Sequence, residues 1–330
     1  GMAYEALNNA SRLKSNFIIV LNDNNMSISE NVGGMSQYLN GLRTAQAYTG
    51  LKKGVEDTLK KIPGKGDRII YHMKRTKSGI KQLFVPGMFF EDMGITYLGP
   101  VDGHDIHKLT RILNEAKRVD HAVLVHVMTK KGKGYVPAEE NPSRFHGTGP
   151  FDIPSGTAVG KKATDSYTDV FSKVLADIGK QDEKVVAITA AMADGTGLAR
   201  FAKMFPQRFF DVGIAEQHAV TFSSGLAKNG LIPVFAVYST FLQRSYDQLI
   251  HDVAMQNLKV IFAIDRAGFV GEDGESHQGV FDTSFLNSVI GLTVFAPSTF
   301  DELEAMFYQA IYKIDGAVAV LSLIHISEPT

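Results

Sequence analysis

The chain has 330 residues, a formal net charge of −1 at pH 7, 44% hydrophobic and 21% charged residues, and no cysteine. This composition is that of an ordinary globular protein of about two domains, with no basic excess for nucleic acid and no run of about 18 apolar residues for a membrane span. The lack of cysteine excludes disulfides and thiolate metal sites, and it fits the reducing cytoplasm, where we expect the protein.

Strands and helices are predicted to alternate along most of the chain. Short apolar runs predict strands at Phe17–Leu21, Ala122–Met128, Val185–Thr189, Phe209–Val212, Pro233–Val237, Val260–Ile264, Leu292–Phe295 and Ala317–Leu321. Helical spacing of apolar residues predicts helices at Ile106–Ala116, Tyr167–Ile178, Glu216–Ala227, Phe241–Met255 and Asp301–Ile311. This alternation predicts an α/β fold with parallel sheets that helices cover on both faces.

A stretch rich in Gly and Pro, GKGYVPAEENPSRFHGTGPFDIPSGTAVG, separates two such segments and is typical of a crossover linker. We therefore predict a first domain at residues 1–134, a linker at 135–163 and a second domain at 164–321. Residues 33–81, rich in Lys and Gly, are predicted to be a surface excursion of the first domain. Residues 322–330 follow without a domain of their own and indicate a non-native tail.

The first predicted strand, Phe17–Leu21, is apolar without alternation, as in a parallel strand buried on both faces. It is followed at once by the polar run Asn22–Asn25. Ligands of open α/β sheets bind beyond the carboxyl ends of strands, and short oxygen-bearing side chains there suit Mg²⁺ that bridges to a phosphate. The alternative is a simple turn, which Asn and Asp favour.

Glu216 and His218 stand in the first turn of a predicted helix, shortly after the strand Phe209–Val212. A carboxylate at a helix N-terminus is explained by ordinary capping, because the helix dipole stabilises it. The surrounding sequence is strongly apolar, however, and a glutamate in such surroundings can hold its proton and serve as a proton donor.

Aromatic and ionisable residues also follow two later strands. Tyr238, Phe241 and Arg244 come after the strand Pro233–Val237. The next strand leads into a glycine-rich loop with four ionisable residues, Arg266, Glu272, Asp273 and His277. Arg and His can bind a carboxylate or phosphate, and His can also move protons. A surface loop would explain the glycines and acids, but three strand ends with such side chains favour an active site.

Six motifs occur in the order NDNNMSIS, GPVDGHD, TKKGKGY, DVGIAEQHAVTF, YSTFLQRSYDQ and DRAGFVGEDGESHQG. With them the chain resembles the 1-deoxy-D-xylulose-5-phosphate synthase family, thiamine-diphosphate enzymes of the transketolase-like group, over about Gly1–Val320. The resemblance implies two thiamine-diphosphate-binding-type domains, each a mostly parallel sheet with helices on both faces.

The resemblance also implies the cofactors thiamine diphosphate and Mg²⁺, with the metal bound by Asn24 and Met26. The residues implied to bind the cofactor are Asn24, Lys130, Lys131, Tyr135, Glu216 and Phe241. The residues implied to bind substrate are Tyr238, Arg244, Arg266, Asp273 and His277. The catalytic residues implied among them are Glu216, Arg266, Asp273 and His277.

The implied transferase reaction is the decarboxylative condensation of pyruvate with D-glyceraldehyde 3-phosphate to 1-deoxy-D-xylulose 5-phosphate and CO₂. This reaction is the first step of the non-mevalonate isoprenoid pathway and also feeds thiamine and pyridoxal synthesis. The family further implies a homodimer, with neither nucleic acid nor membrane as a partner. Two alternatives stay open: a transketolase or 2-oxo-acid dehydrogenase component, and a non-catalytic binding module with the same fold.

The sequence departs from the family pattern at both ends. The family's Gly-Asp-Gly metal motif would precede Gly1, and its C-terminal domain is absent. After Val320 the family has an Arg-Tyr-Pro-Arg-Gly-like run with a substrate-binding arginine, whereas this chain has Leu321-Ser322-Leu323-Ile324. We therefore expect an internal fragment of the enzyme that is inactive by itself.

Overall fold

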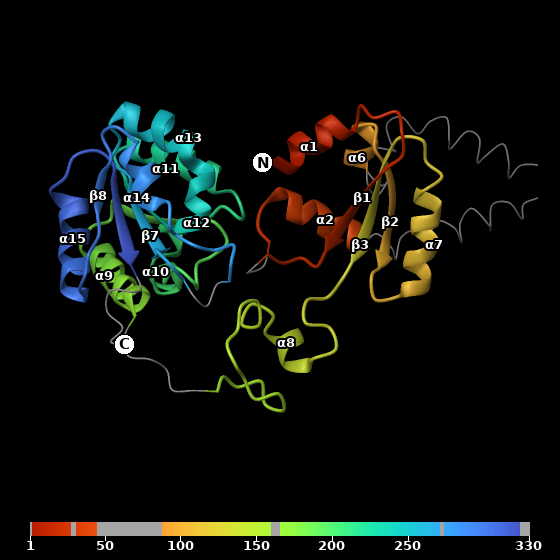
Figure 1. Cartoon of the computed structure of the whole chain (residues 1–330), viewed down its shortest axis with the longest axis horizontal. Coiled ribbons are helices and arrows are strands. Elements are labelled where there is room, and N and C mark those ends of the chain that lie inside the picture. The colour runs from red at the N-terminus through yellow and green to blue at the C-terminus, as the bar shows by residue number, and fades with distance from the viewer. Residues whose placement is uncertain (1, 28–30, 45–87, 160–165, 271–273, 324–330) are drawn as a thin grey trace, which may run out of the picture. The chain divides into compact units, whose positions relative to one another are not determined.

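The computed structural model describes residues 2–27, 31–44, 88–159, 166–270 and 274–323 (Figure 1). The chain forms two compact units, Gly1–Met26 with Gly33–Phe145, and Ser27–Val32 with His146–Thr330. Both units are built on parallel sheets with helices, as the alternating pattern predicts. Of the helices described, none is both long and apolar enough to cross a membrane.

The first unit is built on three parallel strands in the order β1-β3-β2. The strands are β1 Phe17–Asp23, β2 Thr96–Asp102 and β3 Ala122–Met128. The helices are α1 Met2–Ala10, α2 Gly34–Thr44, α6 Met88–Asp92, α7 Ile106–Ala116 and α8 Val136–Glu140. Residues of α1, α2 and α6 pack on one face of the sheet and those of α7 on the other. Helix α2 takes up part of the predicted surface excursion, and residues 45–81 of it lie outside the described residues.

The expectation that the first strand is buried on both faces is wrong. The side chains of Phe17 and Val20 are 47% and 55% exposed. The reason is the position of the strand, because β1 forms an edge of the described sheet while β3 lies at its centre. In β3 the residues from Ala122 to Val127 are all buried.

Strand β2 is missing from the elements predicted by sequence pattern. Its run TYLGPVD is interrupted by Gly99 and Pro100, and the pairing with β3 shifts register between Leu98 and Val101. Such an interruption conceals the strand from a search for unbroken apolar runs.

The second unit is a parallel sheet of six strands in the order β5-β4-β6-β7-β9-β8. The strands are β4 Val185–Thr189, β5 Phe209–Asp211, β6 Ile232–Tyr238, β7 Ile261–Ala267, β8 Thr293–Phe295 and β9 Val318–Leu323. The main helices are α9 Tyr167–Gln181, α10 Ala199–Met204, α11 Glu216–Lys228, α14 Asp282–Asn287 and α15 Phe300–Tyr312. Residues of α9, α10 and α15 cover one face and those of α11 and α14 the other (Figure 1).

The helix predicted at Phe241–Met255 is broken into short pieces. They are α12 Ser239–Leu242, the 3₁₀ turn Gln243–Ser245, α13 Tyr246–Gln248, the π-helical turn Leu249–Val253 and the 3₁₀ turn Ala254–Gln256. Ser245 leaves helical geometry, with φ −105° and ψ 17°. The regularly spaced apolar residues of this segment nevertheless face the sheet, since Leu242, Leu249 and Val253 are buried against it.

Candidate functional site

The candidate site of the second unit lies where parallel strands β4, β6 and β7 end. Because these three strands are neighbours in the sheet, the residues that follow them meet at one edge, where open α/β sheets bind ligands. Helix α11 begins at Glu216, five residues after β5, the neighbour of β4.

Glu216 is buried and paired with an arginine. Its side chain is 4% exposed, and Arg244 Nη1 lies 2.9 Å from Glu216 Oε2. Arg244 comes from the 3₁₀ turn after α12 and remains 30% exposed. Besides the apolar surroundings expected from the sequence, Arg244 brings a positive charge to the carboxyl group of Glu216. A buried carboxylate without such a partner would be costly.

Three rings form a row beside this pair. Tyr238 stacks on Phe241 with 5.8 Å between ring centroids and 20° between planes. The His277 ring meets Phe241 edge-on at 5.2 Å and 87°. His277 Nδ1 is also 2.8 Å from the Ser276 hydroxyl oxygen. The loop after β7 is thus in contact with the residues that follow β6.

Arg266 covers the other end of this row. Its guanidinium carbon lies 3.9 Å from the Tyr238 ring centroid, a cation–π contact. Arg266 Nη1 donates to the carbonyl of Gly195 at 3.2 Å, and the backbone amide of Arg266 donates to Asp265 Oδ1 at 2.8 Å. Arg266 has φ 58°, a left-handed conformation that is uncommon outside glycine. Strained backbone of this kind is found most often at functional sites.

The residue at position 195, in the loop after β4, must be a glycine, because the Tyr238 side chain comes too close to it for a Cβ atom to fit. A Cβ atom at Gly195 would lie 1.8 Å from the Tyr238 hydroxyl oxygen. Sequence pattern did not single out Gly195, because its role depends on a tyrosine from another strand.

A buried hydrogen bond connects Ser239 at the start of α12 with Asp282 at the start of α14. The Ser239 hydroxyl donates to Asp282 Oδ1 at 2.6 Å, and Asp282 is 2% exposed. Burial raises the pKa of Asp282 to about 6, against the smaller lowering effect of the Ser239 hydrogen bond. Neither residue was a sequence candidate, since an Asp at the start of a helix gives no sign of its burial.

The loop after β7 is closed at its base. Gly268 and Gly279 exchange backbone hydrogen bonds of 3.1 and 2.7 Å, and Gln278 bonds both the amide and the carbonyl of Val270. His277 lies within this loop, whereas the predicted site residue Asp273 falls outside the described residues.

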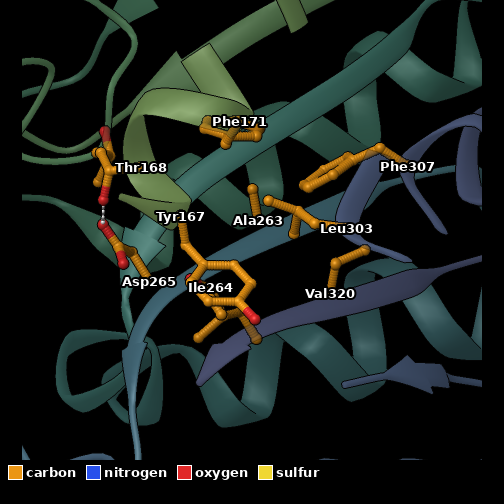
Figure 2. A pocket seen from close by; sticks show the side chains of 11 residues that line it. Tyr167, Thr168, Phe171, Ala263, Ile264, Asp265, Leu303, Phe307 and Val320 are labelled. Atoms are coloured by element: carbon orange, nitrogen blue, oxygen red, sulfur yellow. Dashed lines mark hydrogen bonds between the residues drawn. The ribbon is translucent and has the colours of Figure 1, made fainter. Parts of the chain in front are cut away.

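A small cavity of about 20 Å³ lies on the face of the second unit's sheet that α9 and α15 cover, next to strands β7 and β9 (Figure 2). That volume suffices for one or two water molecules and not for a cofactor. Apolar side chains such as Phe171 and Phe307 line it, and Thr168 donates to Asp265 Oδ2 at 2.9 Å at one side. The cavity is therefore too small to be the cofactor site, and the Thr168 hydrogen bond beside it holds Asp265, the neighbour of Arg266.

In the first unit, the residues after β1 form a tight turn. Asp23 Oδ1 accepts the amide of Asn25, and Asn24 Oδ1 accepts the amide of Met26, both at 3.0 Å. Asn25 has φ 61°. The side chain of Asn24 is half-buried, and an amide oxygen retains a second lone pair for a cation. Among the described residues there is no group of three or more His, Asp or Glu able to hold a metal ion.

The predicted cofactor residues of the TKKGKGY motif lie around α8. Lys130 Nζ lies 2.5 Å from Glu139 Oε2, and the pKa of Glu139 is lowered to about 2, chiefly by this bond. Burial lowers the pKa of Lys131. The Tyr135 ring meets Phe145 edge-on at 5.6 Å.

Comparison with known proteins assigns relatives to both units. Residues 1–129 match the family model described as 1-deoxy-D-xylulose-5-phosphate synthase, and residues 164–323 match the model described as transketolase, pyrimidine binding domain. The chain is 59% identical over 320 residues to the 1-deoxy-D-xylulose-5-phosphate synthase of Lachnoclostridium phytofermentans, a match covering 97% of this chain and 51% of that protein.

A second synthase, from Clostridium kluyveri, is 56% identical over 94% of this chain and 50% of its own length. Among solved structures, a transketolase from Campylobacter jejuni is 17% identical, with a TM-score of 0.46, over 97% of this chain and 54% of that chain. The chain spans about half the length of the curated relatives it matches.

Proposed function

Because the chain belongs to the 1-deoxy-D-xylulose-5-phosphate synthase family, we propose that its first unit binds the diphosphate and Mg²⁺, and its second unit the aminopyrimidine ring, of the thiamine diphosphate used by such a synthase. The reaction proposed for the whole protein is the condensation of pyruvate with D-glyceraldehyde 3-phosphate to 1-deoxy-D-xylulose 5-phosphate and CO₂. The observation that carries the proposal is the buried Glu216 at the start of α11 and its contact with Arg244, which lies three residues after the half-buried Phe241.

The residues of the second unit suit the aminopyrimidine ring of the cofactor. Glu216 would hydrogen-bond a ring nitrogen through its carboxyl group, and Phe241 would stack against the ring. When bound, thiamine diphosphate supplies the electron sink that allows the carboxyl group of pyruvate to leave as CO₂. Glu216 would meet the ring nitrogen through Oε1, while Arg244 holds Oε2 in place through the 2.9 Å contact.

Arg266, His277 and Tyr238 would bind the substrates. Both substrates are anionic, one a carboxylate and one a phosphate, and Arg266 and His277 supply the donors that such groups need. The stack of Tyr238 on Phe241 places a hydroxyl group near Gly195 and Arg266. Asp273 is proposed as a further substrate residue, from the motif alone.

The turn Asn24–Met26 would hold Mg²⁺ in the first unit. The side-chain oxygen of Asn24 and the backbone carbonyl of Met26 are hard oxygen ligands, which suit this ion when phosphate oxygens supply further ligands. Lys130, Lys131 and Tyr135 would lie near the diphosphate. For Lys130 this role requires exchange of the contact with Glu139 for one with a phosphate.

We also propose a homodimer in the cytoplasm. Large apolar side chains are exposed around the candidate site, with Ile214 and Phe281 61% and Phe269 74% exposed. An exposed apolar surface of this kind is typical of a protein interface. Sedimentation of the whole protein, compared with a variant carrying Phe269→Ser and Phe281→Ser, tests this proposal. The variant dimer should dissociate into monomers at a higher protein concentration than the unaltered dimer does.

The domain division also remains a proposal. It places the first domain at residues 1–134, a linker at 135–163, the second domain at 164–321 and a non-native tail at 322–330. In the structure α8 falls within the proposed linker, and β9 includes residues 322 and 323.

The experiment that tests the proposed function uses the extended protein, meaning this chain within a protein of the length of its curated relatives. It is incubated with thiamine diphosphate, Mg²⁺ and glyceraldehyde 3-phosphate, with either pyruvate or a ketose phosphate as donor. The proposal predicts product and CO₂ in equal amounts from pyruvate only. Product from the ketose without CO₂ would assign the chain to a transketolase instead.

A further inference from the structure

A buried chain of hydrogen bonds crosses the sheet of the first unit. Tyr97 on β2, His126 on β3 and Asp23 on β1 lie on one face of the sheet. The Tyr97 hydroxyl oxygen is 2.8 Å from His126 Nδ1, and His126 Nε2 is 2.9 Å from Asp23 Oδ2. His126 is fully buried and Asp23 is 5% exposed.

The direction of these bonds follows from the chemistry of the three groups. An ionised carboxylate only accepts hydrogen bonds, so His126 carries its proton on Nε2 and donates it to Asp23. His126 Nδ1 is then an acceptor, and the Tyr97 hydroxyl donates to it. Burial raises the pKa of Tyr97, which keeps this donor protonated.

The chain of hydrogen bonds ends at the turn that carries Asn24. Asp23 uses Oδ2 for His126 and Oδ1 for the backbone amide of Asn25, so its carboxyl group connects the imidazole to the turn. From the other side, the Thr129 amide donates to the carbonyl of Asp23 at 2.9 Å and the Thr129 hydroxyl donates to Asn22 Oδ1 at 2.7 Å. The orientation of Asp23 therefore determines where Asn25 and its neighbours lie.

The surroundings make this arrangement costly unless all its hydrogen bonds are formed. Tyr97 stacks on Phe90 at 6.0 Å with 6° between planes, within the cluster that includes Leu124 and Ile95. A buried polar group without a partner is destabilising, so loss of the Tyr97 hydroxyl would favour rearrangement of His126 and Asp23.

We propose that Tyr97, His126 and Asp23 position the Asn24–Met26 turn, so that the affinity of this turn for a divalent cation depends on a tyrosine hydroxyl on the opposite edge strand. These three are positioning residues, and none of them is placed as a ligand. The effect on cation affinity depends on the proposed role of Asn24, whereas the effect on the turn itself does not.

The test compares two tyrosine variants. Tyr97→Phe removes the donor and keeps the ring on Phe90. Tyr4→Phe is the control, because Tyr4 lies in the same unit, where its ring meets Phe89 edge-on at 6.3 Å and its side chain is 42% exposed. Amide hydrogen exchange and ¹⁵N spectra of the His126 ring are recorded without cation, and Mg²⁺ affinity is then measured on the extended protein with thiamine diphosphate.

Tyr97→Phe should shift the His126 Nδ1 resonance, speed exchange at Asn25 and Met26 and weaken Mg²⁺ binding about tenfold or more, with little change at the β3 amides. Tyr4→Phe should leave the imidazole resonances and the Mg²⁺ affinity as they are. Equal loss of affinity in both variants, uniform acceleration of exchange, or unchanged Mg²⁺ affinity in Tyr97→Phe would overturn the inference. Failure of the unaltered extended protein to bind Mg²⁺ would instead refute the proposed role of Asn24, and the exchange data would still report on the turn.

Discussion

Arg244 donates to Glu216 at 2.9 Å, so the glutamate at the start of α11 is held by a charge from a segment 28 residues later in the chain. The Glu216 side chain is almost fully buried while Arg244 is partly open to solvent, at 4% and 30% exposure. The carboxyl group is therefore oriented before any ligand arrives.

A double-mutant cycle should measure this coupling. Glu216→Gln, Arg244→Gln and the double variant are compared by urea denaturation at pH 7. We expect a coupling free energy of about 1–2 kcal/mol, below the value for a fully buried pair because solvent screens Arg244. Strictly additive single effects would show that the pair contributes nothing to the folded state.

Gly195→Ala should disturb the ring row. The new methyl group would overlap the Tyr238 hydroxyl, and the ring cannot move freely between Phe241 and Arg266. We expect a loss of about 1–3 kcal/mol in the free energy of unfolding, partly restored by adding Tyr238→Phe. Gly225→Ala is the control, because nothing lies near its Cβ position in α11, and it should be neutral or stabilising. Equal effects of the two alanines would contradict the close approach.

Asp282 should make stability depend on pH in a defined direction. The pKa of Asp282 is raised to about 6 in the folded protein from an ordinary value of 3.8. As pH rises from about 4 to 7, the unfolded chain releases this proton before the folded protein does, so stability is lost, and the loss levels off about one pH unit above the folded-state pKa. Relative to Asp282→Asn, the free energy of unfolding should fall by up to about 3 kcal/mol between pH 4 and pH 7. A difference that is flat with pH would exclude a buried, titrating Asp282.

Lys130→Ala should raise the pKa of Glu139. The Lys130 hydrogen bond is the main cause of the low value of about 2, and the amide of Gly134 lowers it further. In the variant, the pKa of Glu139 should therefore rise but stay below 4.5, the ordinary value of a glutamate. NMR of the Glu139 carboxyl carbon follows this titration. Lys133→Ala, which removes only a weaker charge effect, should change it little. A larger shift with Lys133→Ala would refute the assigned pairing.

Part of the fold was predictable because local pattern decides it. The bounds predicted for Ile106–Ala116, Ala122–Met128 and Val185–Thr189 are those of α7, β3 and β4. In α7, the apolar residues Leu109, Ile112 and Leu113 face the sheet, and Asp105 caps the helix. Burial of β3 and β4 on both faces favours almost continuous apolar runs, which are visible in the sequence and are interrupted within the buried part of β3 only by His126.

The remaining features depend on contacts between distant residues. The exposure of Val20 follows from the edge position of β1, which an apolar run does not reveal. The pairing of Arg244 with Glu216 and the burial of Asp282 likewise require the tertiary structure. The sequence indicated which strand ends carry reactive side chains, but not which of those side chains touch.

The central claim is that Glu216 acts on the cofactor in the condensation of pyruvate with glyceraldehyde 3-phosphate. The most direct test is the rate of 1-deoxy-D-xylulose 5-phosphate formation by the extended protein and its Glu216→Gln variant, both saturated with thiamine diphosphate and Mg²⁺. Glu304→Gln, an exposed carboxyl-to-amide change on α15, serves as the control. We predict that Glu216→Gln lowers kcat at least about 100-fold, as expected for loss of a proton-transferring group, and that the control keeps full activity. A Glu216→Gln variant with the kcat of the unaltered protein would contradict the claim.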